Sequence, residues 1–376
     1  MIKNIPKVIA ILLAIATIIF LSINIYNSKD NGNDNDNNDV GKENKEVIEK
    51  LDLSFMEELE FLEDIKQIDD DNYLLFVRQG SVTSSLLYNY TIYKYNIENG
   101  VHLININIDK GYEFCGIDKE NKLVYLILVD YENPNEQRED TEILVMDYEN
   151  MIVKDKKKNI NQVYNLAVAE SGEKVAYNKE DGMYISNIDF SNEIKILSNL
   201  IEEDMIESKS FVPYEFTNNK VVYGKNGYEW VEGIGIYDVK NKTNNFVEQI
   251  DSEYLRHSED NIFYTEQYEP KTIQKVNVLN TNKEQFFVLD EGQSEYQNRR
   301  VYLSNDLERI LVIKNIYNDD MVEISLKLYD SNSKKLIASQ NLEPERYANI
   351  DDVIFEEDKV IFSKSYNMYI WNYMVK

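Results

Sequence analysis

One short apolar pattern recurs seven times along the chain and constrains the fold more than any other feature. Each copy is a string of four to seven mostly apolar residues, and successive copies start 49, 52, 46, 41, 48 and 50 residues apart. A period of this length is typical of a supersecondary unit whose copies stack on one another. The copies are YLLFV from Tyr73, KLVYLIL from Lys122, KVAY from Lys174, KVVY from Lys220, NIFY from Asn261, RILVI from Arg309 and KVIF from Lys359.

The copy around Lys174 shows what one unit contains. Residues 165–200 read NLAVAESGEKVAYNKEDGMYISNIDFSNEIKILSNL, which divides into four short strand-like strings joined by polar turns. Such strings predict a four-stranded antiparallel meander, and a string that is apolar throughout is buried on both faces. Because a lone meander cannot cover both of its faces, seven copies predict an all-β, seven-bladed β-propeller.

The ends of the repeat region predict how the ring closes. The last copy supplies only three strands before Lys376, whereas the strand-like segment 46–55 precedes the first copy. We expect that segment to be the outer strand of the last blade, so that the propeller occupies residues 46–376. An open ring, or six blades with a decayed repeat, is the alternative. The segment 55–66, FMEELEFLEDIK, is predicted as the one helix of this region.

The N-terminus predicts a membrane anchor. Residues 8–26, from Val8 to Tyr26, contain no charge, and 19 helical residues at about 1.5 Å each just cross a hydrocarbon core of about 30 Å. Lys3 and Lys7 precede this segment, so the positive-inside rule predicts a cytoplasmic N-terminus and an extracytoplasmic propeller at the cell membrane. Residues 1–29 then form the stub and single-pass transmembrane helix, and 30–45 an Asn/Asp-rich linker. A cleaved signal peptide is the alternative.

One unit resembles a known repeat. Residues 170–189, ESGEKVAYNKEDGMYISNID, are similar to the repeat of TolB-type (WD40-like) propellers, and the strings SNDLERILVI from Ser304 and SEDNIFY from Ser258 resemble it more loosely. Most other copies lack the Asp-Gly pair of that repeat. The resemblance implies the propeller fold. It implies either a peptide-binding module or the gating half of an enzyme like prolyl oligopeptidase, because fold alone does not determine function.

Composition argues against several classes of function. The chain has 68 acidic and 40 basic residues, a net charge of −28, which disfavours nucleic acid and favours cations, basic peptides or neutral glycans as partners. Its two histidines, His102 and His257, are expected in strands as structural residues, and the lone Cys115 as a core thiol. No G-x-S-x-G motif or zinc-ligand pattern is present in the sequence, so we assign no catalytic residue, metal or cofactor.

The loops after the second strands contain the candidate ligand-binding residues. Several of these loops are long, and long loops on a rigid scaffold often carry function. We expect them to form an aromatic and acidic rim suited to a protein or peptide partner, including a basic one. The alternatives are tyrosines that merely cap strand ends, a carbohydrate-active enzyme with a carboxylate pair in the funnel, and a structural subunit of an envelope complex. The rim residues are Tyr88, Tyr90, Tyr131, Glu132, Tyr228, Trp230, Tyr268, Glu269, Tyr317, Asp319 and Asp320.

Overall fold

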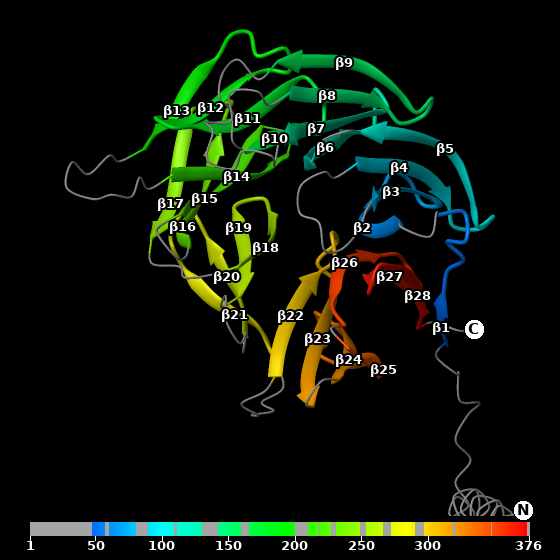
Figure 1. The fold of residues 1–376 in the computed structure, drawn as a ribbon. Helices are drawn as coiled ribbons and strands as arrows, with labels where there is room; N and C mark the ends of the chain where they lie inside the picture. The colour runs from blue at the N-terminus through cyan, green and yellow to red at the C-terminus, as the bar shows by residue number, and fades with distance from the viewer. Residues whose placement is uncertain are drawn as a thin grey trace, which may run out of the picture. The chain divides into compact units, whose positions relative to one another are not determined.

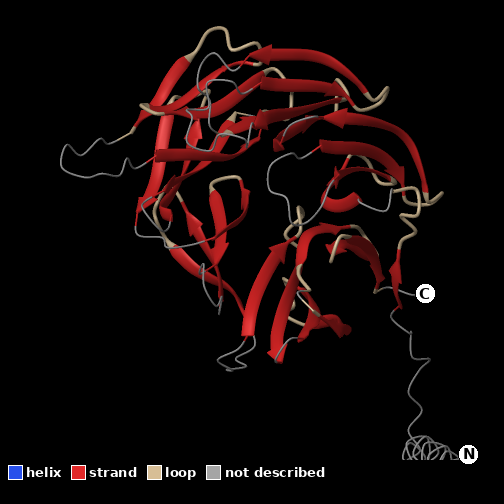
Figure 2. Cartoon of the chain, viewed as in Figure 1, coloured by secondary structure: helices blue, strands red, loops and turns tan. Residues whose placement is uncertain are grey.

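The structure of the chain is a computed structural model, and its described residues all belong to one compact unit, Lys45–Lys376. They contain strands and turns and no helix (Figure 2). The described residues are 47–56, 60–79, 89–108, 111–129, 142–158, 165–199, 210–217, 219–226, 231–248, 253–265, 272–289, 297–318, 321–346 and 348–373.

The strands form seven four-stranded antiparallel sheets, each a blade of the propeller (Figure 1). Blades 1 to 3 contain β2 (Glu60–Gln67), β3 (Asn72–Gln79), β4 (Asn89–Asn96), β5 (Val101–Ile108); β6 (Gly111–Asp118), β7 (Leu123–Val129), β8 (Glu142–Asp147), β9 (Ile152–Lys158); and β10 (Leu166–Val168), β11 (Lys174–Lys179), β12 (Gly182–Asn187), β13 (Ile194–Ser198).

Blades 4 to 7 follow the same order from the inner to the outer strand. They contain β14 (Ser210–Thr217), β15 (Lys220–Asn226), β16 (Val231–Asp238), β17 (Thr243–Glu248); β18 (Glu253–Ser258), β19 (Asn261–Thr265), β20 (Thr272–Asn277), β21 (Lys283–Val288); β22 (Gln297–Leu303), β23 (Arg309–Asn318), β24 (Met321–Asp330), β25 (Leu336–Glu345); and β26 (Ile350–Phe355), β27 (Lys359–Lys364), β28 (Asn367–Asn372) with β1 (Val47–Lys50).

The seven recurring strings are the second strands of the seven blades, as predicted. Their central residues are fully buried, since residues 73–77 of β3 and 360–362 of β27 are each 0 % exposed. A strand buried on both faces selects apolar side chains at consecutive positions, which explains the uninterrupted strings. The prediction of seven four-stranded antiparallel blades is therefore confirmed.

The ring closes through a strand from the start of the chain. β1 pairs antiparallel with β28, placing Val47 opposite Asn372 and Lys50 opposite Tyr369, and so completes blade 7. Among the described side chains, a buried apolar cluster lies at each of the seven junctions between neighbouring blades, including the junction between blades 7 and 1. Each blade thus buries both faces against its neighbours, the arrangement that gives a propeller its stability.

Turns after the third strands follow a common local rule. The side-chain oxygen of the first turn residue accepts a hydrogen bond from the backbone N–H three residues later, at 2.6–3.0 Å. This geometry explains why Asp or Asn recurs at that position, because a short side chain can satisfy the turn backbone. The pairs are Asn96 with Asn99, Asp147 with Asn150, Asp238 with Asn241, and Asp330 with Ser333.

The helix predicted at 55–66 is wrong. Its described C-terminal half is strand β2, which pairs with β3 and has a β-bulge between Leu62 and Asp64. The bulge shifts the alternation of the strand, so that Leu62 and Ile65 both point into the core. The three-residue spacing between Leu62 and Ile65 is close to the helical period, which is why the sequence predicted a helix here.

The predicted membrane segment, Val8–Tyr26, and the linker after it lie outside the described residues. Within the residues that the structure does describe, no helix has the length and apolar character needed to cross a bilayer.

Candidate functional site

The inner strands of five blades are irregular in the same way. β2, β6, β14, β18 and β26 each contain one extra residue relative to the second strand of their blade. A bulge re-aims the side chains that follow it. In three of these strands the residue directly after the bulge is charged: Asp64, Glu215 and Arg256.

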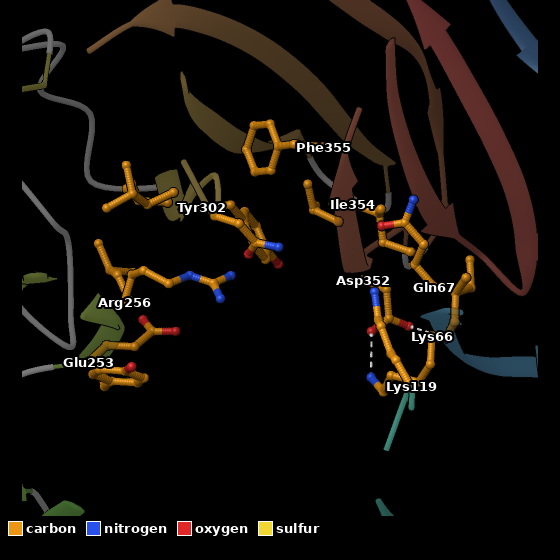
Figure 3. A pocket seen from close by; sticks show the side chains of 16 residues that line it. Lys66, Gln67, Lys119, Glu253, Arg256, Tyr302, Asp352, Ile354 and Phe355 are labelled. Atoms are coloured by element: carbon orange, nitrogen blue, oxygen red, sulfur yellow. Dashed lines mark hydrogen bonds and ion pairs between the residues drawn. The ribbon is translucent and has the colours of Figure 1, made fainter. Parts of the chain in front are cut away.

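A cavity of about 410 Å³ opens between the inner strands of blades 1, 5, 6 and 7 (Figure 3). We call it the funnel cavity. Its volume lies in the range of small-ligand sites. The lining comprises the charged residues Lys66, Lys119, Glu253, Arg256 and Asp352, the aromatic residues Tyr254, Tyr302 and Phe355, and Ile65, Gln67, Leu255, Val301, Leu303, Asn305, Val353 and Ile354.

Opposite walls of the funnel cavity carry different charged groups. Figure 3 shows Arg256 and Glu253 on one side and Lys66, Lys119 and Asp352 on the other, with Phe355 above the space between them. The cavity therefore presents charges of both signs, although the chain as a whole is strongly acidic.

One wall is built around a carboxyl pair at the junction of blades 7 and 1. Lys66 forms an ion pair with Asp64, and its Nζ lies 3.6 Å from Oδ1 of Asp352. The backbone N–H of Ile65 donates to Oδ2 of Asp352 at 3.1 Å. Burial and the neighbouring Asp64 carboxylate raise the pKa of Asp352 and Lys66 lowers it, with the net result that the pKa is raised to about 7. Asp352 consequently titrates near neutral pH, well above an ordinary carboxyl group.

The other wall rests on a hydrogen-bonded cluster at the junction of blades 4 and 5. The hydroxyl of Tyr254 donates to Oε2 of Glu215 at 2.5 Å, and Nδ1 of His257 lies 3.1 Å from the same oxygen. Nε2 of His257 lies 2.8 Å from Oγ1 of Thr217. Burial raises the pKa of Glu215, but the hydrogen bonds from His257 and Tyr254 outweigh it and leave the pKa lowered.

The two histidines and the cysteine lie in strands. His257 has an exposed side-chain fraction of 7 % and has hydrogen-bond partners at both ring nitrogens, as a structural histidine should. Cys115 is buried in the apolar cluster between blades 2 and 3, as predicted. His102 lies in β5, and its side chain is outside the described part of the structure.

Two of the predicted rim residues fall within the described structure. Tyr317 is the penultimate residue of β23 and is 44 % exposed. Tyr90 lies in β4 rather than in a loop and is 7 % exposed, with its ring 4.9 Å from that of Tyr112. Tyr90 is therefore a core residue, because β4 begins one position before it. The remaining rim residues, Tyr88, Tyr131, Glu132, Tyr228, Trp230, Tyr268, Glu269, Asp319 and Asp320, lie outside the described residues.

Sequence reasoning missed the charged residues of the funnel cavity. Lys66, Arg256 and Asp352 come from three blades, and nothing local indicates that they face one space. The available signal is a charge within a predicted inner strand and next to apolar residues, since Arg256 follows Leu255 and Asp352 precedes Val353. Without the bulges, the alternation of those strands does not tell which face each charge occupies.

Comparisons with known proteins assign the chain to no family. No family model matches the chain, and no curated protein matches it. Among solved structures, the chain is similar to the β-propeller domain of the trilobed protease from Pyrococcus furiosus, described as having an open velcro topology. The two are 14 % identical with a TM-score of 0.49, and the match covers 85 % of this chain and 96 % of that one. The chain is thus a seven-bladed β-propeller by its own strand pairing.

Proposed function

We propose that this protein is a membrane-anchored, extracytoplasmic binding module that captures a protein or peptide partner through the funnel cavity and the loops around it. The observation that carries the proposal is the cavity itself, of about 410 Å³, with aromatic side chains and charges of both signs on its walls. Aromatic residues and a few oriented charged groups are what ligand pockets use for affinity and orientation. The anchor rests on the uncharged segment Val8–Tyr26.

A capture experiment tests this function. Full-length protein is used as bait in crosslinked membranes, beside an Asn305→Trp variant that places a bulky ring at the cavity. Asn305 lies in the exposed β22–β23 turn and lines the cavity, whereas Asn332 lies in the exposed β24–β25 turn and does not. Asn332→Trp is therefore the matched control. We expect a partner that parent and control both retain and Asn305→Trp loses.

The predicted rim needs a separate bait. A Trp230→Ala, Tyr268→Ala double variant removes two large rings from the long loops. A partner lost only in the double variant would move binding from the cavity to the rim. No specific partner with any bait would contradict capture of a protein.

The second candidate function is a carbohydrate-active enzyme, and one observation favours it. Asp352 lines the funnel cavity with a pKa raised to about 7, and perturbed carboxyl groups in cavities are candidates for acid–base work. Asp64 contacts Asp352, so the pair is closer than the roughly 5–10 Å that separates glycosidase carboxylates. Release of reducing sugar from a glycan panel by the parent protein, abolished by Asp352→Asn, would establish the enzyme.

A further inference from the structure

The funnel cavity contains a guanidinium, that of Arg256, which forms no ion pair with any described residue. Arg256 lines the cavity, and in Figure 3 its guanidinium extends from β18 toward the centre of the space. Its Nε is buried and has no hydrogen-bond partner among the described residues. Within that same part of the chain, Arg256 takes part in no ion pair, in contrast to Lys66 on the opposite wall.

Glu215 does not neutralise Arg256 by contact. Glu215 attracts Arg256 electrostatically, but its carboxylate is occupied by the Tyr254 hydroxyl and by His257. At the β18 bulge, Tyr254 lies opposite Tyr264 of β19 and Arg256 lies opposite the adjacent Phe263. The backbone therefore holds Arg256 at the cavity, while the carboxylate of Glu215 is bound by Tyr254 and His257.

A guanidinium has five N–H donors in a planar fork, which matches the two oxygens of a carboxylate. Bidentate pairs of this kind are stronger than neutral hydrogen bonds. The cavity is thus prepared for a planar anionic group at Arg256.

The rest of the cavity limits what carries that carboxylate. The net charge of −28 repels polyanions at long range, which disfavours nucleic acids and polyphosphates. Glu253 and Asp352 also line the cavity and would attract a basic group of the same ligand, while Tyr302 and Phe355 offer aromatic surface to an apolar one. A ligand with a terminal carboxylate, apolar side chains and no net negative charge fits all of these groups.

The geometry points to the free C-terminal end of a peptide, with its carboxylate on Arg256 and its preceding side chains between Glu253, Asp352 and the aromatic wall. This inference rests on the proposed binding function and names its ligand class. A cavity of this size also suits a chain end better than a continuous chain, because only the end needs to enter.

Two peptide pools test the inference on full-length protein in detergent micelles. Both are N-terminally biotinylated random tetrapeptides, one with a free C-terminal carboxylate and one with a C-terminal amide. We expect the acid pool to be captured at least about tenfold better than the amide pool, the ratio that corresponds to one charge-assisted hydrogen-bond pair. Enrichment of Asp or Glu within the amide pool would assign the site to side-chain carboxylates and overturn the C-terminal inference.

Three variants locate the effect. Arg256→Met should remove the preference for the acid pool, and Arg256→Lys should retain part of it, because an ammonium keeps the charge but not the fork. Arg346→Met, at an exposed turn outside the cavity, is the matched control and should bind like the parent. A preference that survives in Arg256→Met would overturn the inference.

The failure of this inference can be distinguished from failure of the proposed function. Equal capture of both pools would reject the carboxylate and leave peptide binding intact. No capture of either pool, with the membrane partner still retained by the parent bait, would reject chain-end recognition and leave protein binding intact. No capture in either experiment would contradict both.

Discussion

The two walls of the funnel cavity are built by the same backbone device and reach different electrostatic states. At the junction of blades 7 and 1, Lys66 lies between Asp64 and Asp352, so the cation and the carboxyl pair neutralise one another. At the junction of blades 4 and 5, Tyr254 and His257 satisfy Glu215, and Arg256 remains without an ion pair among the described residues. Lys66 on one wall is paired with carboxyl groups of the protein, whereas Arg256 on the other wall is available to a ligand.

The largest expected effect comes from breaking the neutralised wall. Lys66→Met leaves two partly buried carboxyl groups without their cation, and removal of one partner of such an ion pair is destabilising. We expect the free energy of unfolding to fall by about 3 kcal/mol at pH 8, measured by urea denaturation, and by less at pH 5, below the raised pKa of Asp352.

Lys195→Met provides the matched comparison for Lys66→Met. Lys195 pairs with Asp181 at 2.7 Å on the surface of blade 3, where solvent screens the interaction, so its loss should be much smaller. Equal losses in the two variants would show that the carboxyl pair of the cavity wall has no special dependence on its cation.

The pH dependence of the same wall is the second prediction. Asp352 has a folded-state pKa raised to about 7, so between about pH 4 and pH 7 the folded chain holds a proton that the unfolded chain releases. The contribution of this group to stability is therefore present below the unfolded pKa and is lost as pH rises toward 7.

Asp352→Asn removes that titration. The stability of the variant relative to the parent should rise across this interval, by on the order of 2 kcal/mol after allowance for a side chain that is 18 % exposed. Urea titrations at pH 4.5, 6 and 7.5 measure it. Parallel profiles for the parent and the variant would contradict the raised pKa.

The opposite wall gives a smaller effect of a different kind. Tyr254→Phe removes the hydroxyl that donates to Glu215 and leaves that partly buried carboxylate with His257 as its remaining side-chain donor among those described. Loss of a hydrogen bond to a charged group should lower the free energy of unfolding by about 1.5 kcal/mol, measured by urea denaturation. Tyr184→Phe, which loses a similar bond to exposed Asp181, should change it less. A larger loss of unfolding free energy in Tyr184→Phe than in Tyr254→Phe would contradict the greater contribution of the Tyr254–Glu215 hydrogen bond.

The sequence predicts the scaffold better than the cavity, for a physical reason. A strand buried on both faces, such as residues 73–77, requires apolar side chains at consecutive positions, so it is visible in the sequence as a continuous apolar string. The bulge after Leu62 has no recognisable sequence pattern, and because of it strand β2 was predicted as part of a helix. Arg256 and Asp352 line the same cavity only because blades 5 and 7 both border it, and no local sequence pattern encodes that arrangement.

The smallest expected effect distinguishes Arg256 from Lys66. Arg256→Met removes a side chain that attracts Glu215 only at a distance and forms no ion pair with a described residue, and its buried Nε has no described hydrogen-bond partner to lose. Methionine occupies similar space without a polar atom, so the free energy of unfolding should change by no more than about 0.5 kcal/mol, against the much larger loss in Lys66→Met. Both variants are measured by the same urea denaturation at pH 8. A large loss in Arg256→Met would mean that Arg256 holds blade 5 in place as Lys66 holds blade 1, and its guanidinium would then be a structural group rather than one held ready for a ligand.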